Sequence, residues 1–144
     1  MTITSTRFLR LVVSVLLSAG TGAAMAQVPP ASIAGTIWNL TIAGQPASPL
    51  TIDTQAGPGA PGNQDCRNLH GVLGDQVPVE GFYCVANGHL QLLHKNIGSR
   101  NTVRVFSGEV FIGPTGQSLM RGVVGNHASA FGDLGYFGFV AEAQ

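Results

Sequence analysis

Two apolar runs at residues 102–112 and 117–126 form the clearest pattern in the chain, and the turn sequence GPTG separates them. Both runs are rich in apolar residues, and the first is rich in β-branched and aromatic residues that suit the pleated surface of a strand. Because Pro presets φ for a turn and Gly accepts positive φ, residues 113–116 are predicted to join the two strands as a hairpin. Apolar side chains fall on both faces of this hairpin. We therefore expect one face to lie in the core and the other to meet a second chain.

Short strand-like runs recur through the chain, and none shows a helical period. They predict eight strands, at residues 36–43, 49–54, 66–73, 78–86, 89–95, 102–112, 117–126 and 134–141. The Gly- and Pro-rich residues 55–65 and the polar residues 126–133 are predicted to be loops. Asn87-Gly88 favours a tight hairpin, since both residues accept positive φ. Hairpin-length links favour an all-β, antiparallel up-and-down meander, and closing it into an eight-stranded β-barrel removes both sheet edges.

The first residues have the features of a signal peptide. Arg7 and Arg10 flank a short apolar run, and small residues end in AMA at 24–26. The apolar run is shorter than the about 20 residues of a membrane span, so cleavage after residue 26 is favoured over an uncleaved anchor. We expect a secreted or periplasmic protein with a signal peptide at 1–26, an N-terminal lead-in at 27–35 and one barrel domain at 36–144.

The remaining composition argues against several functions. Without Arg7 and Arg10, five Lys and Arg face seven Asp and Glu, so there is no basic patch for nucleic acid. The four His lack metal-ligand spacing. No nucleophile–base pair, paired carboxylates or phosphate loop stands in a suitable context. We expect a protein that is not an enzyme and needs neither a cofactor nor a metal.

Cys66 and Cys84 are the two cysteines of the chain, and an exported protein meets an oxidising compartment. If residues 74–76 centre a hairpin, opposed residues have numbers that sum to about 150, as 66 and 84 do. This register predicts a disulfide across adjacent strands, which would contribute on the order of 3 kcal/mol if unstrained. A redox role would call for a C-x-x-C-like motif, which is absent.

Several of the predicted strands carry motifs similar to those of the avidin/streptavidin family. VFSGEVFI at 105–112 resembles the sixth strand of that family, and LHKN at 93–96 resembles the end of its fifth. GTIWN at 35–39 is similar to the family's opening motif, and SPLTI at 48–52 to its second strand. The resemblance covers the whole mature domain and implies an avidin-like barrel.

The resemblance also implies which residues line a pocket. Asn39 and Ser48 match positions that bind the biotin ureido oxygen, and Phe106 matches a pocket aromatic. The chain departs from the family at other pocket positions: Leu73 replaces a Tyr, His94 and Val124 replace Trp, Phe137 replaces Asp or Asn, Arg104 stands at a small polar position and Asp75 at the rim. Asn126 completes the expected lining. Because the aromatic walls and the polar cage are incomplete, we expect no tight biotin binding.

Arg104 is expected to point inward, and a lone charge is costly to bury. Either it pairs with Asp75 or with loop carbonyls near the mouth, or it anchors an acidic ligand group. The ligand would then be an anionic or polar small molecule.

Three classes of function stay open. One of them is an enzyme on a small barrel, for which no residue gives positive evidence, and the other two are favoured. The first is a non-catalytic small-ligand-binding barrel. The alternative is a secreted protease inhibitor that inserts its lead-in, with Val28-Pro29-Pro30, into a protease cleft. A homo-oligomer is also expected, because outward positions on the last three strands are apolar: Val103, Val105, Phe111, Leu119, Val123, Tyr136 and Val140.

Overall fold

The computed structural model describes residues 28–60, 63–74, 76–96, 102–128 and 132–144 of the 144-residue chain. Its strands are β1 (Thr36–Ile42), β2 (Ser48–Ala60), β3 (Asn63–Leu73), β4 (Val77–Cys84), β5 (His89–Asn96), β6 (Thr102–Ile112), β7 (Ser118–Ala128) and β8 (Gly132–Ala143). Nothing in these ranges forms a helix that is long and apolar enough to cross a membrane. The predicted signal peptide lies outside the described residues.

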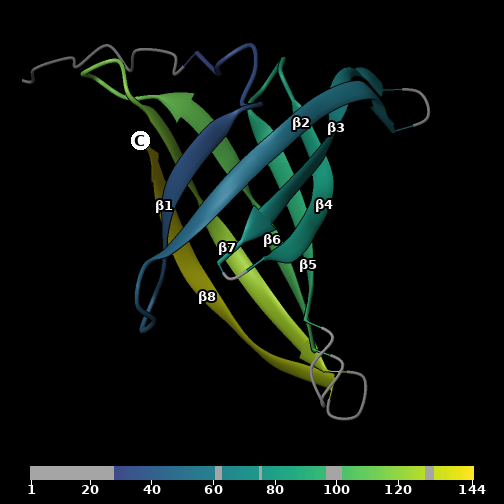
Figure 1. The fold of residues 1–144 in the computed structure, drawn as a ribbon, viewed down its shortest axis with the longest axis vertical. Helices are drawn as coiled ribbons and strands as arrows, with labels where there is room; N and C mark the ends of the chain where they lie inside the picture. Colours follow the sequence, from purple (N-terminus) through teal and green to yellow (C-terminus); the bar gives the residue numbers. More distant parts are fainter. Residues whose placement is uncertain (1–27, 61–62, 75, 97–101, 129–131) are drawn as a thin grey trace, which may run out of the picture.

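The strands close into a single barrel (Figure 1). Each strand pairs antiparallel with the next, and β8 returns to pair with β1. Closure satisfies the hydrogen-bonding groups that an open sheet would leave at its two edges. The predicted eight-stranded antiparallel barrel is confirmed.

Side chains alternate between the inside and the outside of the barrel. On β1, Trp38, Leu40 and Ile42 are buried, whereas the residues between them are exposed. This alternation follows from the two-residue period of a strand. It gives every described residue of the barrel a face that can be assigned from its register.

The predicted loop at residues 55–65 is wrong. β2 continues to Ala60 and β3 begins at Asn63, so most of this stretch is a twisted extension of a hairpin. Register shifts on both sides of Pro58 and a φ of 66° at Gly57 let the ladder continue past residues that usually end a strand. The predicted loop at 126–133 is likewise too long, because β7 runs to Ala128 and β8 starts at Gly132.

The two tight turns are present where they were predicted. Gly116 takes a φ of 86°, and the Gly113 N–H donates to the Gln117 carbonyl at 2.7 Å. At Asn87-Gly88 only the glycine takes positive φ (73°), and its N–H donates to the Cys84 carbonyl at 2.8 Å. This turn spans four residues rather than two, so Asn87 does not need positive φ.

Cys66 and Cys84 lie directly opposite each other on β3 and β4 and form a disulfide. The predicted bridge and its strand register are confirmed. Gly74 and Gln76, on either side of the turn, both have positive φ. That conformation is easy for glycine and strained for glutamine.

The lead-in at residues 28–35, here called the strap, lies across one end of the barrel. The Tyr83 hydroxyl donates to the Pro30 carbonyl at 2.6 Å, and the Ile112 N–H donates to the Val28 carbonyl at 3.2 Å. Ile33 is 1% exposed and belongs to the core. Burial raises the pKa of Tyr83 to about 12, so its hydroxyl stays protonated. The strap therefore lies over this end of the barrel. We take the opposite end, at which β1, β3, β5 and β7 finish, as the candidate open end.

Candidate functional site

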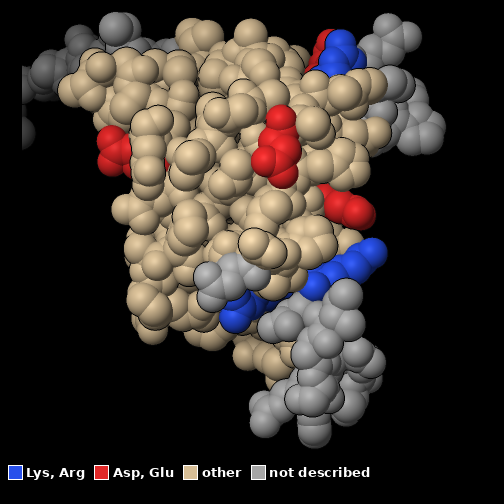
Figure 2. Space-filling view, viewed as in Figure 1, with Lys and Arg blue, Asp and Glu red and all other residues tan. Residues whose placement is uncertain are grey.

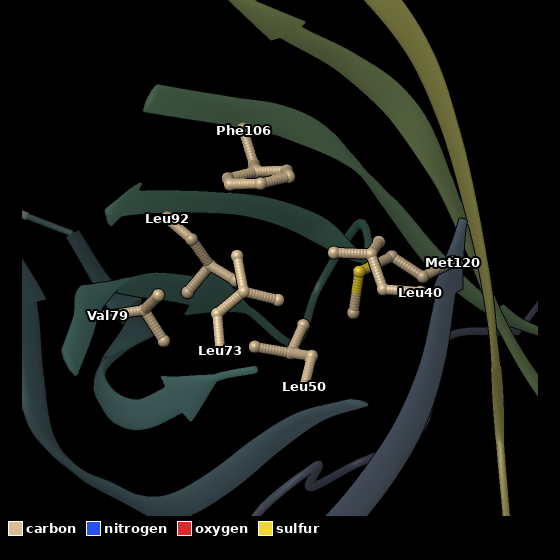
Figure 3. Close-up of a pocket in the computed structure, with 7 residues that line it drawn as sticks. All are labelled: Leu40, Leu50, Leu73, Val79, Leu92, Phe106 and Met120. Atoms are coloured by element: carbon tan, nitrogen blue, oxygen red, sulfur yellow. The ribbon is translucent and has the colours of Figure 1, made fainter. Parts of the chain in front are cut away.

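The centre of the barrel is filled by apolar side chains. Each of β1 to β7 contributes one, and Figure 3 shows them converging on the axis: Leu40, Leu50, Leu73, Val79, Leu92, Phe106 and Met120. The gap between them has no room for a water molecule. Leu73 and Phe106, two of the predicted pocket residues, are thus parts of a packed core.

Polar inward-facing residues begin one step nearer the open end. His94 on β5 lies opposite Arg104 on β6, and Arg104 lies opposite Asn126 on β7. They share the inner face with buried Leu92 and Phe106, which are two residues away on their strands. We call His94, Arg104 and Asn126 the polar row. Because adjacent strands are about 5 Å apart, the backbones at His94 and Asn126 are about 10 Å apart across the sheet.

His94 is a buried polar side chain on the inner face of β5. Its side chain is 5% exposed, and neither Nδ1 nor Nε2 meets a partner among the described residues. Burial lowers the pKa of His94, and the nearby Arg104 guanidinium lowers it further. The ring is therefore neutral at pH 7, with one nitrogen a donor and the other an acceptor.

Asn126 adds a second unsatisfied group, because its Oδ1 is also buried and has no described partner. Buried polar atoms in folded proteins nearly always have partners, since an unpaired one loses its bonds to water and gains nothing. Three unpaired atoms on two members of one row therefore call for an explanation.

Arg104 is half-buried at the centre of the row. The expected partner Asp75 lies outside the described residues. Every Asp and Glu side chain that the structure describes is exposed: Asp53, Asp65, Glu80, Glu109 and Glu142. Among the described side chains, Arg104 makes no ion pair within 4.0 Å.

An apolar border lies beside the polar row. Val124 pairs with Phe106 on one side and with Phe137 on the other, so the three share the inner face. Val124 is fully buried, whereas Phe137 is 36% exposed. Phe137 is therefore partly accessible to solvent beside the polar row.

Two other predicted pocket residues lie elsewhere. Asn39 is exposed on the outside of β1, because Trp38 and Leu40 on either side of it take the inward positions. The prediction that Asn39 lines the interior is wrong. Ser48 on β2 is half-buried and pairs with Leu40 on β1. Because β2 is four strands from β6, which carries Arg104, Ser48 lies on the opposite wall of the barrel.

Sequence reasoning missed the strap as a structural element. Ile33 was the available signal, as the one large aliphatic residue between Pro30 and the first strand. The unpaired state of His94 and Asn126 had no signal, because it depends on which side chains face them across the sheet. Among the described residues, no group of three or more His, Cys, Asp or Glu is placed to hold a metal ion.

No protein-family model, curated protein or solved structure matches the chain.

Proposed function

We propose that this protein is a non-catalytic barrel that binds a small anionic or polar ligand at its open end. One observation carries the proposal: His94 is buried opposite Arg104, and neither of its ring nitrogens has a hydrogen-bond partner among the residues that the structure describes. Such an arrangement lowers stability, and binding sites keep groups of this kind because a ligand satisfies them.

The packed centre restricts where the ligand would lie. The apolar layer that includes Leu73, Leu92 and Phe106 leaves no room for a water molecule. The ligand would therefore rest on this layer, in contact with the polar row and Phe137. A shallow position of this kind supports modest affinity, since it buries less of the ligand than a deep pocket does.

A distant relationship to the avidin family is part of the proposal and rests on the sequence motifs, with which an eight-stranded barrel is compatible. The outward position of Asn39 removes a further contact that the family uses for biotin. We expect biotin to bind weakly or not at all, and nanomolar affinity in calorimetry would contradict that expectation.

The inhibitor alternative is less well supported. Its lead-in would have to be free to enter a protease cleft, whereas residues 28–35 are bound along one end of the barrel through Tyr83 and Ile112.

We also propose a homo-oligomer formed through the outer faces of β6 to β8. Val123, Tyr136 and Val140 are 48%, 64% and 59% exposed, and the register places them on one outer surface. Phe111 is less available, because the Arg121 guanidinium lies 4.8 Å from its ring centroid. Figure 2 shows a different face, the one over which β2 runs in Figure 1, where charged side chains are few and scattered. A self-complementary apolar surface is typical of symmetric dimers.

An exported location remains part of the proposal. The Cys66–Cys84 disulfide supports it, because such bonds persist in oxidising compartments.

A thermal-shift screen of the purified oxidised protein tests the proposed function. The probes are small carboxylic acids, neutral sugars and biotin, each measured against wild type and Arg104→Gln. We expect acids to raise the melting temperature of wild type and to do so less in Arg104→Gln. Lys95→Gln is the matched control, because Lys95 is exposed and lies outside the polar row. An equal acid response in wild type and Arg104→Gln would contradict the proposed site.

A further inference from the structure

The polar row contains both hydrogen-bond donors and hydrogen-bond acceptors. Neutral His94 offers one N–H donor and one nitrogen acceptor, and Asn126 Oδ1 is a second acceptor. Arg104 offers only donors. A ligand that satisfies the row must therefore supply donors as well as acceptors.

A simple carboxylate meets only half of this requirement. Its oxygens accept from Arg104 and from the His94 N–H, but an ionised carboxylate donates nothing. The His94 acceptor and Asn126 Oδ1, which are already buried, would stay without a partner.

The ligand's donor is more favourable when it is uncharged. An ammonium group would lie within about 5 Å of the Arg104 position at either neighbour in the row, where like charges repel. All the Asp and Glu side chains that the structure describes are exposed, so none of them offsets this repulsion inside the barrel. A hydroxyl or an amide N–H has no such penalty.

We propose, on the basis of the proposed function, that the ligand is a carboxylic acid with a hydroxyl or amide N–H donor beside its acid group. The acid group lies on Arg104, and the neighbouring donor reaches Asn126 Oδ1 or the acceptor nitrogen of His94. The hydrocarbon part of the ligand lies against Phe137, which is partly accessible.

Calorimetric titration with matched acids tests this ligand class. Mandelate and phenylacetate both carry a ring and a carboxylate, and only mandelate carries a hydroxyl beside the acid. Lactate and propionate form a second such pair. We expect the hydroxy acid of each pair to bind at least about tenfold more tightly, the ratio that one net hydrogen bond supplies.

Variants of the polar row show which residues cause the preference for the hydroxy acid. Asn126→Leu or His94→Phe should reduce the preference for mandelate, and the double variant should abolish it. Lys95→Gln should leave the preference unchanged. A preference that persists in the double variant would overturn the assignment, because the hydroxyl would then be received elsewhere.

The outcomes separate the two proposals. Equal binding of mandelate and phenylacetate would overturn the ligand class and leave the binding function standing. Binding of none of the four acids, together with no response in the acid screen, would overturn both. Circular dichroism of each variant shows whether the barrel has folded, and the comparison of the acids on wild type needs no variant.

Discussion

His94 is the residue at which stability and the proposed function oppose each other. Neither ring nitrogen has a partner among the described residues. A buried imidazole without hydrogen bonds is less favourable than an apolar side chain of similar size, because nothing offsets its desolvation. Asn126 Oδ1 is likewise buried without a hydrogen-bond partner among the described residues. The barrel would be more stable with apolar residues at both positions.

His94→Phe should therefore keep or raise the free energy of unfolding at neutral pH, by up to about 1 kcal/mol. Urea unfolding measures this change directly. A loss of more than about 2 kcal/mol would indicate that the imidazole is structurally satisfied in solution.

The lowered pKa of His94 also predicts a pH dependence. As pH falls below about 6.5, the unfolded chain protonates this histidine while the folded chain resists it, so the unfolded state binds more protons and stability declines. Arg104 strengthens the effect by repelling the extra charge. Urea unfolding at about pH 7.5 and about pH 5.5 should show a smaller loss for His94→Phe than for wild type. Equal losses in the two proteins would contradict the lowered pKa.

At the scale of strands, short strand-like runs joined by hairpin-length links predicted the barrel, Gly, Pro and Asn residues predicted its two tight turns, and the centre of the 74–76 turn predicted the cysteine register. The segment at 55–65 was not predictable from its Gly and Pro content, because bulges let a ladder tolerate residues that normally end it. The face of Asn39 was mispredicted because the sequence motif places Trp38 and Asn39 side by side. Only one of two adjacent residues points inward, and the larger apolar side chain takes that position.

Glycine positions in β6 and β7 show how closely the strands are packed. Gly108 and Gly122 lie opposite each other, and the ring of Phe139 rests against both. A Cβ on Gly122 would lie 2.6 Å from the Gly108 Cα and 2.8 Å from the Phe139 ring, and would also overlap the Ser107 carbonyl oxygen. A side chain at this position would force the two strands apart.

Gly122→Ala should accordingly lower the free energy of unfolding by about 2 kcal/mol, in the range found for overpacked cores. Gly138→Ala on β8 is the matched control, since beyond its chain neighbours no atom lies within 4 Å of the place that a Cβ would take, and its backbone is free of positive φ. We expect that control to stay within about 0.5 kcal/mol of wild type. Similar effects of the two substitutions in chemical denaturation would contradict the close packing.

The whole molecule has three layers along the barrel axis: a strap over one end, a packed apolar centre and a polar row near the other end. The outer surface of β6 to β8 adds a separate apolar region that does not belong to this axis. Sequence patterns predicted that region, because outward apolar residues are visible once strands are assigned. They left open whether the barrel was filled, since packing depends on how side chains from seven strands meet.

Val123→Lys should dissociate the proposed oligomer, because it places a charge within an apolar contact that would have to desolvate it. Sedimentation velocity at micromolar concentration should give a dimer or tetramer for wild type and a monomer for the variant. Thr54→Lys adds the same charge at an exposed position on β2 and should leave the mass unchanged. A monomeric wild-type protein would remove the basis for this interface.

Nuclear magnetic resonance of the histidine rings tests most directly whether the polar row is a binding site. The His94 ring signals can be assigned by their loss in His94→Phe, and His70, which is exposed on β3, serves as an internal reference. During titration with mandelate, the His94 signals should shift in a saturable way while those of His70 stay in place. Unchanged His94 signals throughout the titration, or shifts that appear equally at His70, would contradict a ligand site at the open end of the barrel.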